Sequence, residues 1–348
     1  MADPVNVLIR CDGNHDIGMG HVSRCLALAD ELRDRERCTV RFAMRGLESA
    51  GAAAARAAGF AVDAVTADSN ADYGEELRAI ASAQAASALV VDVRDALSRG
   101  SLEAIRGRGM RIVAIDEGTD RRLAADLAFY PPVPQADEMN WTGFAGRRYA
   151  GWDWVLLRRE FVTDNFSSPE LSGRSPAIDV LVTMGGSDPA GMTEFALAAL
   201  DLLPMPLAVC VVIGPAFARE GPLSAAVVRS THAIRIASAP ASLAPLMRAS
   251  RLAVAAFGVS AYELAACGVP AVHVCLTDDH ARSSSAFDQE GAAVTAGVFD
   301  RLTPQRLSDP IRRLIGRADR RGQMARRASQ LVDGRGAARV AALVAAAL

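Results

Sequence analysis

The sequence predicts an α/β protein made of two Rossmann-like domains in tandem, and three observations lead to that prediction. Short β-branched segments alternate with longer amphipathic segments, which is typical of parallel strands joined by helices. The chain of 348 residues is long for one hydrophobic core and suits two domains. A Ser-, Pro- and Gly-rich segment at 162–176 separates one strand–loop–helix series from a second one, which is typical of a domain linker.

The N-terminal domain is predicted to cover residues 1–162. It opens with a strand at 5–10, which is followed by a glycine-containing loop and by a helix over about 22–35. Apolar residues recur at helical spacing on that helix, at Val22, Cys25, Leu26, Ala29 and Leu32. Further strands are predicted at 38–44, 88–93 and 111–115.

The C-terminal domain is predicted to cover residues 176–330 and to repeat this pattern. A strand at 178–184 leads into a second glycine loop and a helix over about 192–203, and further strands are predicted at 207–213, 252–257, 271–276 and 292–296. The remaining segment, 331–348, contains an apolar helix that we expect to pack back on the first domain. Because ligands of parallel sheets bind outside the carboxyl ends of the strands, both sheets are expected to face a central cleft.

Composition narrows the function classes. Hydrophobic residues make up 51% and charged residues 22% of the chain, which predicts folded cores. A net charge of −2 argues against non-specific nucleic-acid binding. The six cysteines lack the spacing of a zinc site or a disulfide framework, and no metal or cofactor is expected. The first residues lack a signal peptide and no apolar run is long enough to cross a bilayer, so we expect a cytoplasmic protein without membrane insertion.

The first glycine loop carries a candidate base, His21. Gly18 and Gly20 allow a tight turn and a close approach of the backbone to a ligand. His21 is expected at the start of the next helix, where free N–H groups favour a nearby anion and the helix dipole keeps the imidazole neutral. Alternatively, His21 only caps or packs the start of that helix. His15, in the same loop, is either a second titrating group or a solvent-exposed side chain.

The second glycine loop is a candidate diphosphate site. The backbone of Gly185 and Gly186 and the hydroxyl of Ser187 suit a diphosphate. The alternative is a plain turn in which Asp188 is the helix N-cap and Pro189 is the first helical residue. The two descriptions are compatible with each other.

Two further places at predicted strand ends carry polar side chains. Glu263 is expected in the first turn of a helix, where its carboxylate either favours the helix dipole or accepts two ribose hydroxyls. Asp279 and His280 follow the strand at 271–276 and are either ligand contacts or part of a solvated loop. His273, inside that strand, and His232 are interpreted as structural histidines.

Several motifs follow one another in order along nearly the whole chain. They are Arg10-x-Asp12, Gly18-Met19-Gly20-His21-Val22-x-Arg24-Cys25-Leu26, Val91-Asp92, Ile115-Asp116, Asp120-Arg121, Tyr149-Ala150-Gly151, Leu157-Arg158-Arg159-Glu160-Phe161, Gly185-Gly186-Ser187-Asp188-Pro189, Gly214-Pro215-Ala216-Phe217 and Tyr262-Glu263-Leu264-Ala265-Ala266-Cys267-Gly268-Val269-Pro270. This succession resembles the PseG family, the UDP-2,4-diacetamido-2,4,6-trideoxy-β-L-altropyranose hydrolases of pseudaminic acid biosynthesis. It is also similar to spore-coat polysaccharide proteins of the SpsG type and to MurG-type glycosyltransferases, which share the GT-B fold.

The resemblance implies a GT-B fold and a hydrolase that cleaves the bond between the anomeric carbon of a sugar and UDP. His21 would be the general base that activates water, and UDP would lie mainly against the C-terminal domain. The positions implied to bind the nucleotide sugar are Arg10, Asp12, Gly18, Gly20, Arg24, Gly185, Gly186, Ser187, Gly214, Ser260, Glu263, Asp279 and His280.

One departure from the family pattern bears on the substrate. The family carries Asp-Asn-Gln where this chain has Asp278-Asp279-His280, which implies a different sugar or an acceptor other than water. Three functions therefore remain open: a nucleotide-sugar hydrolase, a GT-B glycosyltransferase with a small acceptor, and a non-catalytic protein that binds a nucleotide sugar. The first domain has no clear apolar and basic segment for a lipid acceptor, which favours water or a small acceptor.

Overall fold

The computed structural model describes residues 5–14, 17–67, 70–162 and 168–348. The chain divides into two compact units, each with its own parallel sheet. Unit 1 comprises Met1–Arg159 and Arg335–Leu348, and unit 2 comprises Glu160–Gly334. Both units therefore have the doubly wound α/β architecture predicted from the alternation of strands and helices.

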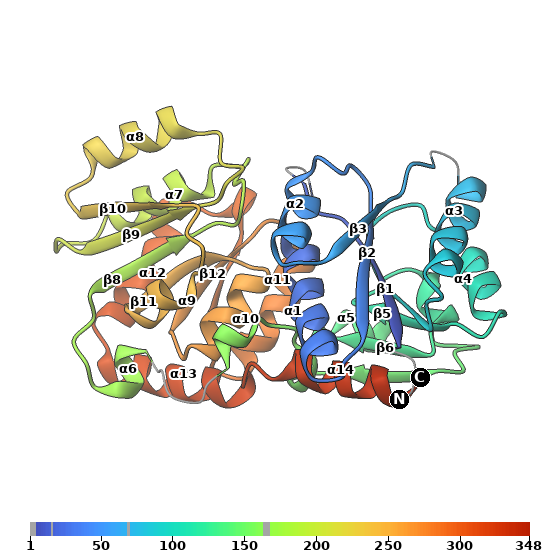
Figure 1. The fold of residues 1–348 in the computed structure, drawn as a ribbon. Coiled ribbons are helices and arrows are strands. Elements are labelled where there is room, and N and C mark those ends of the chain that lie inside the picture. Colours follow the sequence, from blue (N-terminus) through green and yellow to red (C-terminus); the bar gives the residue numbers. More distant parts are fainter. Residues whose placement is uncertain (1–4, 15–16, 68–69, 163–167) are drawn as a thin grey trace. The chain divides into compact units, whose positions relative to one another are not determined.

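Unit 1 contains a seven-stranded parallel sheet with the order β3-β2-β1-β4-β5-β6-β7 (Figure 1). The strands are β1 (Asn6–Cys11), β2 (Thr39–Met44), β3 (Ala61–Ala64), β4 (Ala88–Asp92), β5 (Arg111–Ile115), β6 (Leu127–Tyr130) and β7 (Arg147–Ala150). The helices are α1 (Gly20–Asp34), α2 (Ala50–Ala57), α3 (Asn70–Ala83), α4 (Arg99–Arg106), α5 (Gln135–Glu138) and α14 (Gly336–Ala346).

Helices cover both faces of this sheet, as a parallel sheet requires. Successive side chains of β1 alternate between the two layers: Ile9 packs with α1 and α14, while Leu8 packs in the layer that holds α3 and α4. Figure 1 shows α1 and α14 on one side of the strands and α3 and α4 on the other. Burial on both faces explains why the central strands are continuous apolar runs in the sequence.

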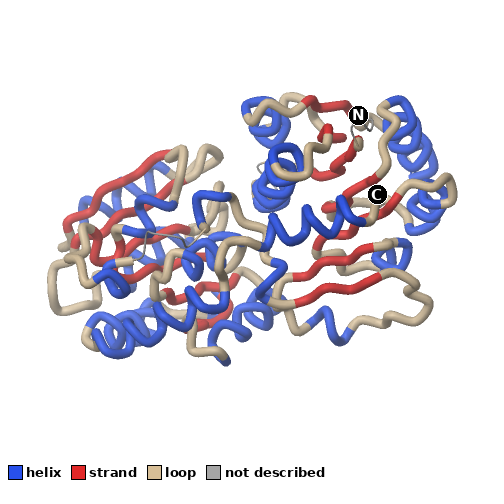
Figure 2. Tube along the Cα trace, turned by 60° about the horizontal axis from the view of Figure 1, so that its bottom comes forward, coloured by secondary structure: helices blue, strands red, loops and turns tan. Residues whose placement is uncertain are grey.

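The last helix, α14, belongs to unit 1 and packs along α1. Val340, Ala341 and Val344 are buried in the same core as Val22 and Leu32. In Figures 1 and 2 this helix lies against the elements of unit 1. The start of α14 lies very close to neighbouring backbone of unit 1, because a Cβ on the first residue of this helix would overlap a backbone carbonyl oxygen there.

Unit 2 contains a six-stranded parallel sheet with the order β10-β9-β8-β11-β12-β13. The strands are β8 (Ile178–Thr183), β9 (Ala208–Ile213), β10 (Ala233–Ser238), β11 (Ser250–Ala256), β12 (Ala271–Cys275) and β13 (Val294–Val298). The helices are α6 (Pro169–Ser172), α7 (Met192–Leu200), α8 (Glu220–Arg229), α9 (Ala244–Arg248), α10 (Val259–Ala266), α11 (Asp278–Gln289), α12 (Pro304–Ile315) and α13 (Ala318–Leu331).

The segment predicted as a linker, 162–176, is partly structured. Helix α6 lies within it, and the buried Ser168 at its start donates its amide to the carbonyl oxygen of Cys267 at 3.2 Å and its hydroxyl to that of Gly268. The residues after 168 therefore pack as part of unit 2, while 163–167 lie outside the described residues. The division between the units falls after Arg159, and the chain returns to unit 1 after Gly334.

Candidate functional site

Each sheet has a switch point, where the strand order reverses and neighbouring strands connect to helices on opposite faces. In unit 1 it lies between β1 and β4, and in unit 2 it lies between β8 and β11. In doubly wound folds, the crevice outside the carboxyl ends of these strands is the usual ligand site. The loops after β1, β8 and β11, together with the helices that follow them, carry most of the candidate residues.

The loop after β1 turns tightly into helix α1. Gly18 has a φ of +74°, a conformation that favours glycine, and its amide donates to the carbonyl oxygen of Asn14 at 3.0 Å. Helix α1 begins at Gly20, and its N-cap residue Met19 makes no side-chain capping bond. His21 is the second residue of this helix, as expected, so it lies among N–H groups that no side chain caps. His15 lies outside the described residues.

The contacts of His21 decide which ring nitrogen carries the proton. Nδ1 of His21 lies 2.7 Å from Oδ1 of Asp92, the last residue of β4, whose side chain is 1% exposed. Burial raises the pKa of Asp92, but the charge and hydrogen bonds of Arg24, and then of His21, outweigh it and hold that pKa well below its usual range. The ionised carboxylate can only accept, and it lies closer to Nδ1 than Nη2 of Arg24 does, at 3.2 Å, so we assign the proton to Nδ1 of His21. When the ring is neutral, Nε2 therefore offers the lone pair.

Arg24 binds the carboxylate of Asp92 from the other side. Its Nε and Nη2 each donate to one oxygen of Asp92, both at 2.6 Å, and its Nη1 donates to Asp116 at 3.0 Å. Burial lowers the pKa of Arg24, but the two carboxylates outweigh it and raise that pKa well above its usual value. The resemblance implies that Arg24 binds the substrate. In this structure its guanidinium binds the carboxylate of Asp92, which it keeps ionised and in place.

Arg10 and Asp12 form a second charged network behind the first loop. The guanidinium of Arg10 is fully buried and donates to both carboxylate oxygens of Asp12 at 2.6 Å, to the hydroxyl of Tyr73 at 2.5 Å and to Asp95 at 2.9 Å. Asp12, 15% exposed, and Asp95, 20% exposed, are the members through which this network can reach a ligand. A cavity of about 280 Å³ adjoins both networks, and it is lined by Asp12, Gly13, Asn14, Ile17, His21, Arg45, Gly46, Ser49, Asp92, Val93, Arg94 and Asp95.

In unit 2 the glycine loops after β8 and β9 are in direct backbone contact. Gly185 has a φ of +89°. A Cβ on Gly214 would overlap the carbonyl oxygen of Gly186, and that oxygen accepts the amide of Ala216 at 3.3 Å. Only glycine fits at 214, and the structure therefore brings Gly186 and Gly214 together at the carboxyl edge of the sheet.

The helix after the second loop starts later than the turn interpretation requires. Helix α7 begins at Met192, with Gly191 as its N-cap, so the placement of Asp188 as N-cap and Pro189 as first helical residue is wrong. The carboxylate of Asp188 still accepts the amides of Met192 and Thr193, at 2.9 and 2.8 Å. Asp188 reaches these amides from outside the helix because the turn at 189–191 adds three residues before the first helical one.

Glu263 lies deeper in its helix than the sequence suggested. Helix α10 begins at Val259, directly after Gly258, which places Glu263 in the second turn, not the first. Its side chain is buried, with 4% of the residue exposed. Ser260 occupies the first turn, where no side chain caps the helix. Ser260 and the free amides are therefore the groups that this helix start offers to an anion.

Asp279 and His280 lie in the first turn of α11 and not in a loop. The hydroxyl of Thr277 accepts the amide of His280 at 3.1 Å and caps the helix. Asp279 is exposed, while the ring of His280 is half-buried beside Phe257, and its buried Nδ1 has no hydrogen-bond partner among the described residues. Burial lowers the pKa of His280, which Asp279 partly opposes.

The two histidines interpreted as structural lie in the core of unit 2. His273 is fully buried, with Nδ1 3.0 Å from the hydroxyl of Ser284, and burial lowers its pKa to about 4. His232 accepts the amide of Leu207 at 3.2 Å.

Sequence patterns assigned no role to Asp92, although it holds the proton of His21 in place. The available signal was its position. Asp92 ends β4, whose preceding residues, at 88–91, are all apolar, and β4 is the strand that pairs with β1. A carboxylate at the carboxyl end of a switch-point strand is a functional candidate by fold geometry alone.

Metal sites and membrane-spanning helices are both absent from the described residues. No group of three or more His, Cys, Asp or Glu side chains in that part of the chain is arranged to hold a metal ion. Within the same residues, none of the helices combines the length and apolar character that crossing a membrane requires.

Comparison with solved structures defines the class of fold. MurG from Acinetobacter baumannii superposes with a TM-score of 0.74 at 16% identity, over 98% of this chain and 99% of that one. A UDP-GlcNAc 2-epimerase from Neisseria meningitidis, solved bound to UDP-GlcNAc, superposes with a TM-score of 0.62 at 11% identity, over 98% and 99%. With its two parallel α/β units, the chain has the GT-B fold.

Comparison of sequences gives one more particular similarity. The spore coat polysaccharide biosynthesis protein SpsG of Bacillus subtilis (strain 168) is 24% identical over 200 residues, which are 57% of this chain. The matched region spans 58% of that relative. No family model matches the chain. The chain is therefore similar to SpsG and to MurG, in sequence and in fold respectively.

Proposed function

We propose that this protein is a nucleotide-sugar hydrolase that releases UDP and a free sugar, as in the PseG family that the sequence resembles. The observation that carries the proposal is the contact between His21 and Asp92, because it leaves Nε2 of His21 as a base beside a cavity. Several proteins of similar fold were solved with UDP, UDP-GlcNAc or UDP-glucose bound, which supports UDP as the nucleotide.

The proposed reaction needs a positioned water and a stabilised leaving group. Nε2 of His21 takes a proton from water while the water oxygen bonds to the anomeric carbon. The bond from that carbon to the diphosphate oxygen breaks, and UDP leaves with the electron pair. The ionised Asp92 stabilises the imidazolium that forms. Amides and hydroxyls at Gly185, Gly186, Ser187 and Ser260 are the groups proposed to stabilise the diphosphate charge, and Glu263 is proposed to hold the ribose.

A glycosyltransferase is the alternative, because an alcohol can replace water at the same carbon. The fold of the spinosyn forosaminyltransferase SpnP, which superposes with a TM-score of 0.65, favours this alternative. Asp279 and His280, which depart from the PseG pattern, are the residues proposed to set the sugar or the acceptor. Because the chain is similar to SpsG, a spore coat polysaccharide biosynthesis protein, we propose that the product of the reaction enters the synthesis of a polysaccharide.

The test is UDP release from a panel of UDP-sugars, followed by product identification with NMR. In His21→Asn, the new amide can still donate to Asp92 but offers no base, so we expect kcat to fall roughly 100-fold or more while UDP affinity stays unchanged. The second variant is Glu263→Gln. We expect calorimetry to show weaker UDP binding in this variant than in the wild type. Melting temperatures of both variants control for folding.

The outcomes separate the candidates. Full turnover without any added alcohol supports the hydrolase, whereas UDP release that requires an alcohol supports the transferase. Wild-type turnover in His21→Asn would remove His21 as the base. Binding of UDP-sugars without release of UDP under any condition would indicate a non-catalytic binding protein.

A further inference from the structure

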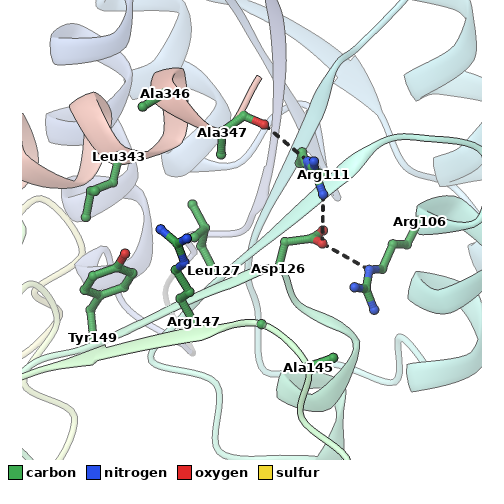
Figure 3. Close-up of a pocket in the computed structure, with 11 residues that line it drawn as sticks. Arg106, Arg111, Asp126, Leu127, Ala145, Arg147, Tyr149, Leu343, Ala346 and Ala347 are labelled. Carbon is green, nitrogen blue, oxygen red and sulfur yellow. Dashed lines mark hydrogen bonds and ion pairs between the residues drawn. The ribbon is translucent and has the colours of Figure 1, made fainter.

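A cavity of about 450 Å³ lies at the opposite edge of the unit 1 sheet from His21. It is formed at the amino ends of β5, β6 and β7, whereas His21 and Asp92 lie at the carboxyl edge of the sheet. Since a five-residue strand spans about 15 Å, the cavity is separate from the candidate active site. Its lining residues, which are drawn in Figure 3, are Arg106, Arg111, Asp126, Leu127, Ala145, Gly146, Arg147, Tyr149, Leu343, Ala346 and Ala347.

Asp126 gathers three arginines at this edge. Its carboxylate accepts Nε of Arg106 at 3.1 Å and Nη1 of Arg111 at 3.4 Å, which Figure 3 draws as dashed lines. Its backbone carbonyl accepts the amide of Arg147 at 2.8 Å. A Cβ on Gly146 would overlap that same carbonyl oxygen, so glycine is what allows β7 to start here. The backbone therefore fixes where Arg147 leaves the sheet, and the carboxylate of Asp126 holds Arg106 and Arg111.

The charges in the cavity do not balance. Three arginines line the cavity together with Asp126, the one carboxylate among the described residues that line it. Arg106 uses only Nε within the described structure, and Arg111 uses Nη1 for Asp126 and Nε for the carbonyl oxygen of Ala347 at 3.2 Å. The exposed side chain of Arg147 has no partner among the described residues. Several N–H donors therefore remain for an anion in a concave site.

One wall of the cavity is apolar. Tyr149 lies on the same face of β7 as Arg147, and Figure 3 shows its ring beside Leu343 of α14, both half-buried. The volume falls within the usual range of small-molecule sites, roughly 300–1,000 Å³, which combine apolar walls with a few placed polar groups. Guanidinium forks match the oxygens of a phosphate.

We propose that this cavity binds a small phosphorylated molecule, with its phosphate between Arg106, Arg111 and Arg147 and its organic part against Tyr149 and Leu343. This site is independent of the reaction proposed above. The carboxylate of Asp126 competes with the phosphate for the arginines. The affinity of the site for phosphate therefore depends on how strongly that carboxylate binds them.

The test is calorimetric titration with inorganic pyrophosphate in the presence of saturating UDP, which occupies any nucleotide site. We expect Arg147→Gln to weaken pyrophosphate binding about tenfold or more, as expected for loss of a charged hydrogen bond. Asp126→Asn, which keeps an acceptor for the amide of Ile112 (2.9 Å in the wild type), is expected to tighten binding. Arg99→Gln, at an exposed arginine paired with Glu103, is the matched control and should bind as the wild type does.

Equal pyrophosphate affinity in the wild type and in Arg147→Gln would overturn the proposal, because Arg147 is exposed and its loss should not unfold the protein. Flotation with phosphatidylglycerol vesicles distinguishes the source of the phosphate. Vesicle binding that requires the three arginines and that pyrophosphate does not displace would also overturn the proposal, since it would indicate a flat membrane contact.

Discussion

At the residue scale, the candidate site depends on one buried carboxylate. Asp92 accepts from His21 and from Arg24, and together these contacts set the tautomer of the ring. The sequence predicted His21 at a helix start, because strand, glycine loop and helix follow one another locally. It could not predict the contact with Asp92, since the two residues are 71 positions apart and meet only through the pairing of β1 with β4.

The lowered pKa of a second buried residue, His273, leads to a prediction of how the free energy of unfolding depends on pH. Burial lowers its pKa from 6.5 to about 4, so between these values the unfolded chain binds a proton and the folded chain does not. The stability associated with neutral His273 is therefore present above about pH 6.5 and is lost as the pH falls toward 4, by on the order of 3 kcal/mol in total.

The measurement is urea unfolding of the wild type and of His273→Gln at pH 7 and pH 5. Over this interval the free energy of unfolding should fall about 2 kcal/mol more in the wild type, because glutamine does not titrate. Protonation of Asp92 does not contribute between pH 7 and pH 5, since its lowered pKa changes the free energy of unfolding only below about pH 4. Equal pH slopes in the two proteins would contradict the prediction.

At the element scale, the buried central strands could be predicted and the marginal ones could not. Strands β1, β2, β4, β5, β8, β9, β11 and β12 lie within a few residues of their predicted positions, because burial makes them largely apolar runs. The edge strand β13 was also predicted, although most of its residues are only half-buried. Strands β3, β6, β7 and β10 were not predicted. Strands β3, β7 and β10 are edge strands with exposed or half-exposed residues, and β6 has only four residues, so their patterns are weak.

The cap of one helix was the other element-scale error, although the predicted start of that helix, at about residue 192, is confirmed. The sequence offers Asp188-Pro189 as a strong start signal, yet α7 begins at Met192. Gly191, with a φ of +76°, admits an extra turn before the helix, and Asp188 reaches past it. Local capping rules cannot foresee such a turn, because in both placements Asp188 accepts amides of the first helical turn, at 190–191 as an N-cap and at 192 and 193 as observed.

Helix α14 offers a sharp test of how unit 1 is held together. Ala341 is fully buried in the core shared with α1, while its neighbour Ala342 is exposed. Ala341→Glu would bury a charge and should lower the free energy of unfolding by several kcal/mol. Ala342→Glu, the matched control, should change it by less than about 0.5 kcal/mol. Thermal unfolding followed by circular dichroism measures both, and similar melting temperatures would show that α14 does not stabilise unit 1.

At the scale of the whole molecule, the two units differ in how the chain builds them. Unit 2 is one continuous segment, whereas unit 1 needs two segments that are far apart in the sequence. We therefore expect a fragment of residues 160–334 to unfold cooperatively by itself. A fragment of residues 1–159 should instead bind the dye ANS, since it exposes the face of α1 that α14 covers.

The rescue variant joins residues 335–348 to the fragment of residues 1–159 through a flexible glycine–serine linker. Loss of ANS binding and a cooperative transition are expected in it. A cooperative transition in the fragment of residues 1–159 without that segment would contradict the prediction.

The return of α14 to unit 1 also sets an order of events during protein synthesis. Chains usually fold their N-terminal domain first as they leave the ribosome. Here the first unit is made early but remains without its closing helix until residue 346 has been translated. The second unit, complete once Gly334 has emerged, can reach its native state before the first one does. Residues 335–348 are made after all of unit 2, yet they complete unit 1 and cover the helix that carries His21.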